Sequence, residues 1–181
     1  MQIVRDITTT VAPTAEVVTL VEAKNYLRVD YDEDDDLIEA LIATAQTRLE
    51  QYAGVAMTER TLRVVAYVDE FIELPYVPTG TISVVEYWDS EAWVPMVVGD
   101  YRVLGDTTKK VYMISNNRME YRFTYTCGYA TTPKGMKTAL LKYVADLYEY
   151  RESSVEDSQP NSNLTTAYEL MKPYKRINYI L

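Results

Sequence analysis

The stretch LIEALIATAQTRLEQY, residues 37–52, decides the fold class of this chain because it has the clearest helical period in the sequence. Its apolar residues recur about three or four positions apart and form a wide stripe on one side of a helix. Gly54 follows and is a typical residue at which a helix ends. We expect this helix to be a core element of a helical bundle. The stripe consists of Leu37, Ile38, Leu41, Ile42, Ala45, Leu49 and Tyr52.

A shorter helix is predicted immediately upstream. Thr19 and Glu22 have the spacing of a capping box, which predicts a helix that runs to about Arg28 and buries Leu20, Ala23 and Leu27. Residues 1–18 show no helical period. They are expected to form an extended arm or an edge strand.

Downstream, between Met57 and Cys127, the apolar period changes to two, which predicts a compact antiparallel β unit. Proline and glycine punctuate the segments and mark the turns between them. The predicted strands cover residues 61–67, 71–74, 81–88, 93–98, 101–103, 111–114 and 120–126.

Helical period returns after Thr132, the expected N-cap, with Pro133 at the first helical position. A second apolar stripe then ends near Arg151, and a short helix is expected from Leu164 to about Met171. Pro173 stops it, and the apolar end of the chain can form a strand with a partner edge. The second stripe consists of Met136, Ala139, Leu140, Tyr143, Val144, Leu147 and Tyr148.

These patterns predict an α+β fold that is mainly a helical bundle with an inserted antiparallel β unit, followed by a C-terminal helix and an extended tail. We expect the following organisation: an N-terminal arm at 1–18, a helical module at 19–57, the β insertion at 58–128, a helix completing the bundle at 129–152, a linker at 153–163, and the C-terminal helix and tail at 164–181.

The composition excludes several classes of protein and site. The chain has 181 residues, 48% of them hydrophobic, and no histidine, which excludes Ser-His-Asp catalysis and His-based zinc sites. A single cysteine, Cys127, excludes an internal disulfide, fits a reducing compartment, and is expected to be a buried structural thiol. No apolar stretch is long enough to cross a bilayer, and the N-terminal residues do not resemble a signal peptide.

The charge is negative and unevenly distributed. The formal net charge is −9, and residues 1–57 hold 11 acidic and 4 basic residues. A sequence-specific duplex binder normally has a basic face, so repulsion is the expected relation of this acidic module to DNA. The 17 tyrosines fit either half-buried strand faces or protein interfaces.

The densest acidic run allows two interpretations. Alternate carboxylates resemble the first ligands of a calcium loop, but Asp35 replaces the required glycine and Leu41 the closing glutamate. The favoured interpretation is a helix N-terminus, whose free N–H groups and dipole attract carboxylates. The run comprises Asp30, Asp32, Glu33, Asp34, Asp35 and Asp36.

The sequence contains only weak signals of catalysis or phosphate binding. No phosphate-binding loop occurs, and no pair of acidic residues lies in an apolar context that would raise a pKa. A basic cluster of Lys172, Lys175 and Arg176 could contact phosphate or neutralise the end of the last helix. The residues therefore favour an interaction protein without cofactor or metal rather than an enzyme.

The ordered set of motifs resembles the head-tail connector proteins of tailed phages, also called adaptor or head-completion proteins. LVEAKNYLRVD at 20–30 and DDDLIEALI at 34–42 are similar to the family's opening, and YTCGY at 125–129 resembles its "Y-T-A-G-Y". The hairpin at 74–87, the helix at 133–151 and MKPYKR at 171–176 resemble its later motifs. Cys127 replaces a small residue, Lys175 stands where an arginine usually follows the tyrosine, and residues 1–18 are not covered.

The resemblance implies a structural virion protein of the neck, assembled in the host cytoplasm. It implies a homo-oligomeric ring of twelve subunits below the portal protein, contact with the tail or the next connector, and a channel through which packaged DNA passes without sequence-specific binding. The C-terminal segment would dock onto the portal, and the acidic run would face either the channel or the outer surface. The docking residues would be Tyr174, Lys175, Arg176, Ile177, Tyr179, Ile180 and Leu181.

Two alternatives stay open at this stage. One is another ring-forming assembly module, such as a tail-terminator-like protein. The other is a carboxylate-based hydrolase, because acidic residues are plentiful.

Overall fold

The computed structural model describes residues 2–114, 119–150 and 162–176, of which Ser162 and Asn163 are described by backbone alone. The chain divides into two compact units. Residues 1–15 and 58–130 form a β unit, and residues 16–57 and 131–181 form a helical unit.

The α+β class is confirmed, but the chain is not mainly a helical bundle, because the described residues contain about as much strand as helix. The expectation overweighted the two long apolar stripes. It missed that the β segments, joined by the first residues of the chain, build two sheets with a core of their own.

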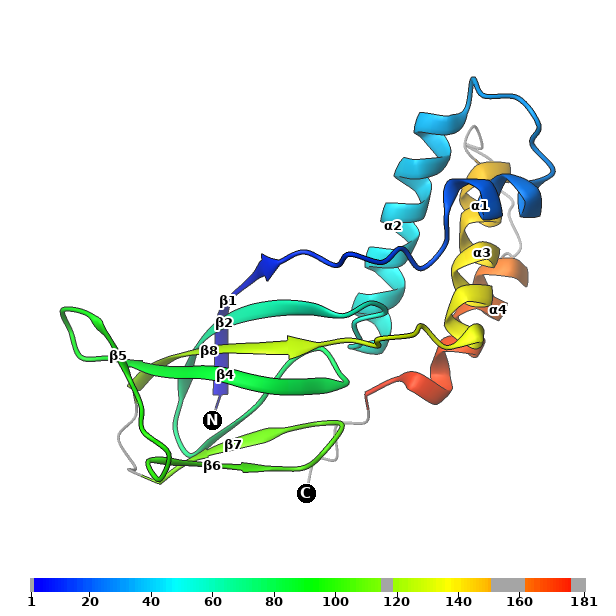
Figure 1. Ribbon diagram of the computed structural model, residues 1–181. Coiled ribbons are helices and arrows are strands. Elements are labelled where there is room, and N and C mark those ends of the chain that lie inside the picture. The colour runs from blue at the N-terminus through cyan, green and yellow to red at the C-terminus, as the bar shows by residue number, and fades with distance from the viewer. Residues whose placement is uncertain (1, 115–118, 151–161, 177–181) are drawn as a thin grey trace. The chain divides into compact units, whose positions relative to one another are not determined.

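The larger sheet has five antiparallel strands in the order β1-β2-β8-β4-β5, and the smaller has three in the order β3-β7-β6 (Figure 1). All seven strands predicted between residues 57 and 127 occur. The strands are β1 (Gln2–Val11), β2 (Arg60–Val68), β3 (Phe71–Glu73), β4 (Thr79–Trp88), β5 (Trp93–Pro95), β6 (Tyr101–Leu104), β7 (Lys110–Met113) and β8 (Met119–Cys127).

The core of the β unit is built from cross-strand pairs on the buried face of the larger sheet. Val64 lies opposite Phe123, and Leu62 lies opposite Tyr125. On the other side of β8, Phe123 also pairs with Val85. These side chains are at most 3% exposed, which follows from the period of two, since alternate residues of each strand point to the same face.

The N-terminal segment contributes an edge strand, the second of the two alternatives expected for it. β1 pairs with β2 along most of its length, from Gln2 opposite Val68 to Val11 opposite Thr61. Every described residue of β1 is exposed.

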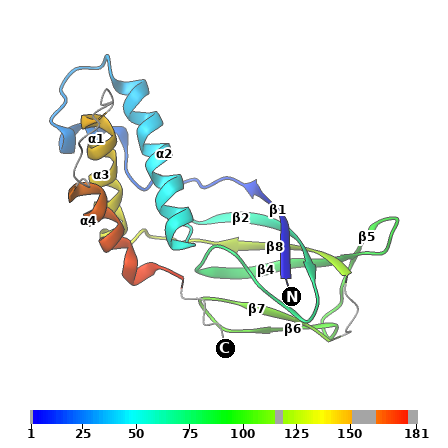
Figure 2. The same cartoon turned by 180° about the vertical axis from the view of Figure 1, so that it is seen from behind.

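The helical unit contains α1 (Leu20–Leu27), α2 (Asp35–Ala53), α3 (Lys134–Glu149), α4 (Ser162–Met171) and the 3₁₀ turn η1 (Lys172–Tyr174). The capping box at Thr19 and Glu22 is confirmed, and Gly54 ends α2 with a positive φ of 67°. α2 packs on α3, and α4 lies alongside α3 (Figure 2). Within the described residues, no helix is long and apolar enough to span a membrane.

Two local predictions are corrected. α3 begins at Lys134 with Pro133 as its N-cap, one residue later than expected, because the Thr132 hydroxyl donates to the carbonyl oxygen of Met57 at 2.8 Å instead of capping the helix. The predicted apolar stripe of α2 is also wider than the part of the helix that is buried against the rest of the chain. Ile38 and Leu49 are fully buried, whereas Leu37 is 37% exposed and Leu41 is half-buried.

Candidate functional site

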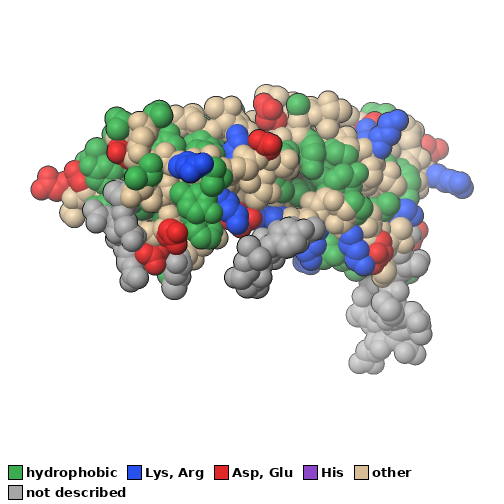
Figure 3. All heavy atoms as spheres, turned by 90° about the horizontal axis from the view of Figure 1, so that it is seen from below, with side chains coloured by type: hydrophobic (Ala, Val, Ile, Leu, Met, Phe, Trp, Pro, Cys, Tyr) green, Lys and Arg blue, Asp and Glu red, His purple; other side chains and the backbone are tan. Residues whose placement is uncertain are grey.

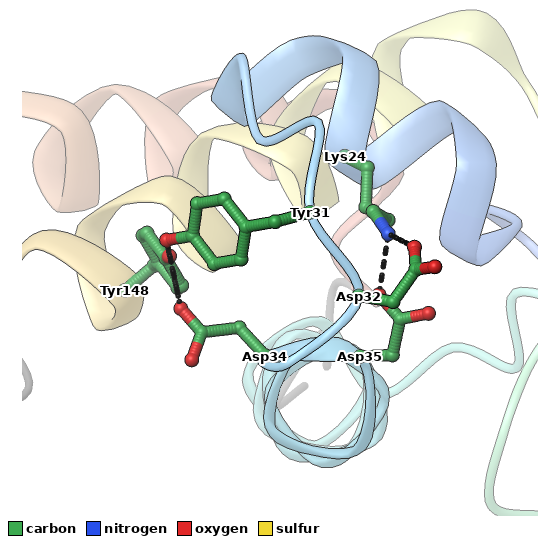
Figure 4. Close-up of polar contacts among 6 residues, drawn as sticks. All are labelled: Lys24, Tyr31, Asp32, Asp34, Asp35 and Tyr148. Atoms are coloured by element: carbon green, nitrogen blue, oxygen red, sulfur yellow. Dashed lines mark hydrogen bonds and ion pairs between the residues drawn. The ribbon is translucent and has the colours of Figure 1, made fainter.

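The acidic loop, residues 30–36, follows α1 and runs into the first turn of α2. Lys24 of α1 points at it: its Nζ lies 2.7 Å from Asp32 Oδ1 and 2.6 Å from Asp35 Oδ1 (Figure 4). The Lys24 side chain is 14% exposed, whereas that of Asp32 is 90% exposed. Hydrogen bonds to Asp32 and then Asp35 raise the pKa of Lys24, and the same contact lowers the pKa of Asp32. A single cation therefore joins α1 to the start of α2.

A second polar cluster ties the acidic loop to α3. The hydroxyls of Tyr31 and Tyr148 lie 2.9 Å apart, and both approach Asp34 Oδ2, with Tyr31 at 3.1 Å (Figure 4). The two hydroxyl groups have only two protons for these three contacts. One tyrosine therefore donates to the Asp34 carboxylate, and the other donates either to the same carboxylate or to the hydroxyl oxygen of the first tyrosine. The hydrogen bond with Tyr148, followed by that with Asp34, raises the pKa of Tyr31 to about 12.

These contacts modify the favoured interpretation of the acidic run. α2 does begin inside it, at Asp35, and Asp35 and Asp36 lie in its first turn. Asp34 occupies the N-cap position, but its side chain makes no capping hydrogen bond because the tyrosine hydroxyls occupy it. The carboxylates serve mainly to join helices, an outcome that depends on Lys24 and Tyr148 from other parts of the chain.

The remaining carboxylates of the loop are free. Asp30, Glu33 and Asp36 are exposed and have no ion pair with any described residue. Over residues 2–114, 119–150 and 162–176, no group of three or more acidic or cysteine side chains is placed to hold a metal ion. Among the described residues, the loop therefore presents three negative charges without an ion pair beside three that are engaged.

One further ion pair joins α3 to α1. Lys137 Nζ of α3 lies 2.5 Å from Glu22 Oε1 of α1, with both side chains roughly 40% exposed. The hydrogen bond from Lys137 is the main cause of the lowered pKa of Glu22. Glu22 thus serves both the capping box of α1 and the contact with α3.

The predicted docking residues fall into two groups. Tyr174, Lys175 and Arg176 lie against helices of the same chain, so these three side chains are already engaged within the helical unit. Ile177, Tyr179, Ile180 and Leu181 lie outside the described residues, as does most of the predicted linker at 153–163.

The three residues of the predicted basic cluster, Lys172, Lys175 and Arg176, make separate contacts within the helical unit. Lys172 Nζ lies 2.5 Å from Glu169 Oε1, and this hydrogen bond raises the pKa of Lys172. The Lys175 ammonium lies 4.3 Å from the centre of the Tyr52 ring. On the face drawn in Figure 3, Lys and Arg side chains are interspersed with acidic and hydrophobic ones rather than gathered into a patch.

Sequence reasoning missed two buried carboxylates, Glu50 of α2, which accepts a hydrogen bond from the Met57 N–H, and Asp146 of α3. Asp146 of α3 is 7% exposed, and its Oδ1 atom has no hydrogen-bond partner among the described residues. Burial, followed by the charge of Glu149, raises its pKa. Asp146, a single carboxylate, was not identified because only pairs of acidic residues in an apolar context were considered. The signal was present, since Asp146 follows Tyr143 by three positions on the apolar side of α3.

Residues 16–172, which include parts of both units, match the model of a family described as head completion protein. No curated protein sequence matches the chain.

Several solved structures share the fold. A chain from the neck of an empty gene transfer agent particle, computed with C6 symmetry, aligns with a TM-score of 0.76 and 16% identity. A chain from the virion of the native particle aligns at 0.77 and 15%, and one from the native neck, computed with C12 symmetry, at 0.72 and 14%. Each alignment covers 97% of this chain and 98% of the other. At these identities the likeness concerns the fold.

Proposed function

The chain belongs to the head completion protein family, and from this premise we propose that it is a structural subunit of a virion neck, at the junction of head and tail. The observation that carries the proposal is the family match over residues 16–172. The shared fold with chains from gene transfer agent necks supports it.

A particle experiment tests this placement. We expect particles assembled without the protein to contain filled or empty heads that lack tails, and particles carrying a tagged chain to bear the tag at the neck. Electron microscopy of labelled particles checks both. A tag located on the shell or the tail tip contradicts the proposal.

The finer part of the proposal is a homo-oligomeric ring around a channel. The particle necks with similar chains were computed with six-fold and twelve-fold symmetry, which supports a ring and is compatible with twelve subunits. Closed rings form through head-to-tail contacts between two different surfaces of the same chain. Native mass spectrometry of the chain, alone and with its portal, measures the number of subunits. A chain that stays monomeric in both conditions would rule out the ring.

The acidic loop gives the channel its proposed character. Asp30, Glu33 and Asp36 face the lumen, and their exposed charges repel passing DNA so that the genome slides without binding. Replacing all three with Asn, Gln and Asn is expected to leave assembly intact and to slow DNA release. The matched control removes three exposed carboxylates of the β unit, as Glu59→Gln, Glu70→Gln and Glu91→Gln. Equal ejection rates in both triple variants contradict a lumenal loop.

The C-terminal residues form the proposed contact with the portal protein. The segment 177–181 is apolar and strand-competent, which suits addition to a partner edge. Deleting residues 177–181 is expected to abolish binding to the portal while the melting temperature stays unchanged. Binding assays with the cognate portal measure this, and full binding by the truncated chain contradicts the contact.

A further inference from the structure

One end of the β unit carries three exposed aliphatic side chains. Val97 is 67% exposed, Val98 94% and Ile114 61%. The segment between β5 and β6, which holds the two valines, runs beside the end of β7, where Ile114 follows (Figure 1). Single exposed apolar residues are common on protein surfaces, whereas a group of them marks a site of interaction. We call these three residues the apolar patch.

Hydrogen bonds through Asp100 hold the apolar patch in place. The Asp100 N–H donates to the Val97 carbonyl oxygen at 3.1 Å, and the Val97 N–H donates to Asp100 Oδ2 at 3.4 Å. The Ile114 N–H donates to the Asp100 carbonyl oxygen at 3.0 Å. Gly99 completes the turn with a φ of 121°, which glycine adopts without strain. The valines are therefore presented by an ordered turn, which has little conformational freedom left to lose on binding.

The helical unit contains a groove with an apolar lining. It has a volume of about 300 Å³ and is lined by the segment that leads into α1 and by α2. Val17 and Val18 are its deepest residues, because both are almost fully buried. Leu20, Ile42 and Ala43 complete its apolar surface. A hollow of this kind can receive small aliphatic side chains from another molecule.

The charges beside the two surfaces are opposite. Glu16 and Glu39 border the groove, are exposed, and have no ion pair with any described residue. Arg102 of β6 follows the turn of the apolar patch by two residues, and it too is exposed without an ion pair to a described residue. Opposite charges around an apolar contact select the partner and fix its orientation.

We propose that the apolar patch of one copy inserts into the groove of the next copy, with Arg102 beside Glu16 and Glu39, as the head-to-tail contact of the ring. The inference rests on the proposed ring and names the two surfaces that form it. A closed ring requires two different surfaces of the same chain. The apolar patch and the groove meet this requirement, so each copy offers the patch to one neighbour and the groove to the other.

Native mass spectrometry of the full chain, alone and with its portal, tests the contact. Val98→Asp should weaken it by about tenfold or more, because burying a valine side chain contributes roughly that factor to affinity. The ring should then be lost at concentrations where the natural chain forms it. The melting temperature should not change, since Val98 makes few contacts within its own chain. Val11→Asp, at another exposed valine of the β unit, is the matched control and should keep the ring.

A charge exchange gives a second, independent readout. Arg102→Glu should abolish the ring, because it places like charges on both sides of the contact. Combining it in one chain with Glu16→Arg and Glu39→Arg restores opposite charges and should restore the ring. A ring that survives Arg102→Glu, or that the triple variant fails to recover while still folded, would overturn the inference.

Mixing two variants tests the head-to-tail direction. Ala43→Trp fills the groove at an exposed position of α2 and should be monomeric by itself. Mixed in equal amounts with Val98→Asp, it should form a dimer with one copy of each, because only one intact patch and one intact groove can meet. Two monomeric variants that fail to pair would show that the patch does not enter the groove.

The remaining outcomes separate this inference from the proposed function. A natural chain that stays monomeric with and without its portal removes the ring, and the inference with it. A natural ring that also forms in Val98→Asp and Ala43→Trp defeats the inference alone. A Val98→Asp ring that no longer attaches to particles would assign the patch to another neck protein, and that result would overturn the inference too.

Discussion

The two units of this chain differ in where their polar contacts lie: the β unit has a part-buried ion pair between Arg122 of β8 and Glu86 of β4, within its larger sheet. The β unit buries aromatic and aliphatic side chains in cross-strand pairs, with Phe123 and Tyr125 fully buried on β8. The helical unit also has an apolar core, but its loops and helix ends are joined by charged and hydroxyl groups, chiefly at Lys24 and Asp34. It also buries the carboxylate of Asp146, whose Oδ1 atom has no hydrogen-bond partner among the described residues.

Changes in salt and pH should therefore affect the polar contacts of the helical unit more than the apolar core of the β unit. Apolar burial depends little on salt and pH, whereas ion pairs near the surface weaken with salt and with protonation. Both tryptophans, Trp88 and Trp93, lie in the β unit, so tryptophan fluorescence reports on that unit separately. Far-UV circular dichroism is dominated by the helices.

The largest expected effect is in the β core. Phe123→Ala should lower the free energy of unfolding by about 3–5 kcal/mol, because the substitution leaves a cavity against Val64 and Val85. Denaturant unfolding followed by tryptophan fluorescence measures it. A loss well under 1 kcal/mol would mean that the sheet face is not a close-packed core.

The helical core is tested by a matched pair of leucines. Leu140→Ala, at a fully buried site of α3, should cost about 2–5 kcal/mol. Leu41→Ala should cost clearly less, because Leu41 of α2 is only half-buried. Unfolding followed by circular dichroism gives both values. Equal losses at the two sites would show that a partner or a second copy covers the outer stripe of α2.

Asp146 predicts an unusual pH dependence. Burial raises its folded pKa above the unfolded value, so its favourable contribution is complete below the unfolded pKa and disappears as pH rises through the folded pKa. Asp146→Asn should therefore stabilise the chain at pH 7, because the amide carries no charge to bury. Melting curves of both chains from pH 7 down to about pH 4 should converge. A difference independent of pH contradicts the buried charge.

Substitution of Lys24 tests the ion pairs that join α1 to the acidic loop and the start of α2. Lys24→Met leaves Asp32 and Asp35 without their shared cation and should lower the melting temperature, more at low salt than at high salt. The raised pKa of Lys24 keeps it charged throughout the neutral range, and the lowered pKa of Asp32 keeps the pair intact until acid protonates the carboxylate. The effect should therefore shrink below about pH 4. Lys142→Met removes the same charge from α3 and serves as the control, and an equal shift there would refute a specific joint.

The smallest expected effect is at a free carboxylate. Asp36→Asn in the first turn of α2 removes only its interaction with the helix dipole, typically about 0.3–1 kcal/mol and screened by salt. Thermal melts at two salt concentrations check this. A larger loss would indicate that Asp36 has a partner of its own.

The residue pattern was enough to predict most elements. The capping box at Thr19, the terminating Gly54 and the alternation of β8 act within a few residues, so they can be recognised without the rest of the chain. The order of motifs also identified the family correctly. The balance of helix and strand was misjudged, because residues 1–18 carry no periodic signal and their strand depends on pairing with β2.

Local signals in the sequence were enough to place most helices and strands, because caps, glycines and apolar periods act within a few residues, whereas β1 needs β2 as its partner. Only the tertiary structure decided what the charged residues do. Lys24 reaches Asp32 and Asp35, Tyr148 reaches Asp34 from more than a hundred residues away, and Arg176 returns to the end of α2. A carboxylate in a run of acids is free or engaged according to which distant side chain folding brings within hydrogen-bond distance, and residue spacing carries no record of that distance.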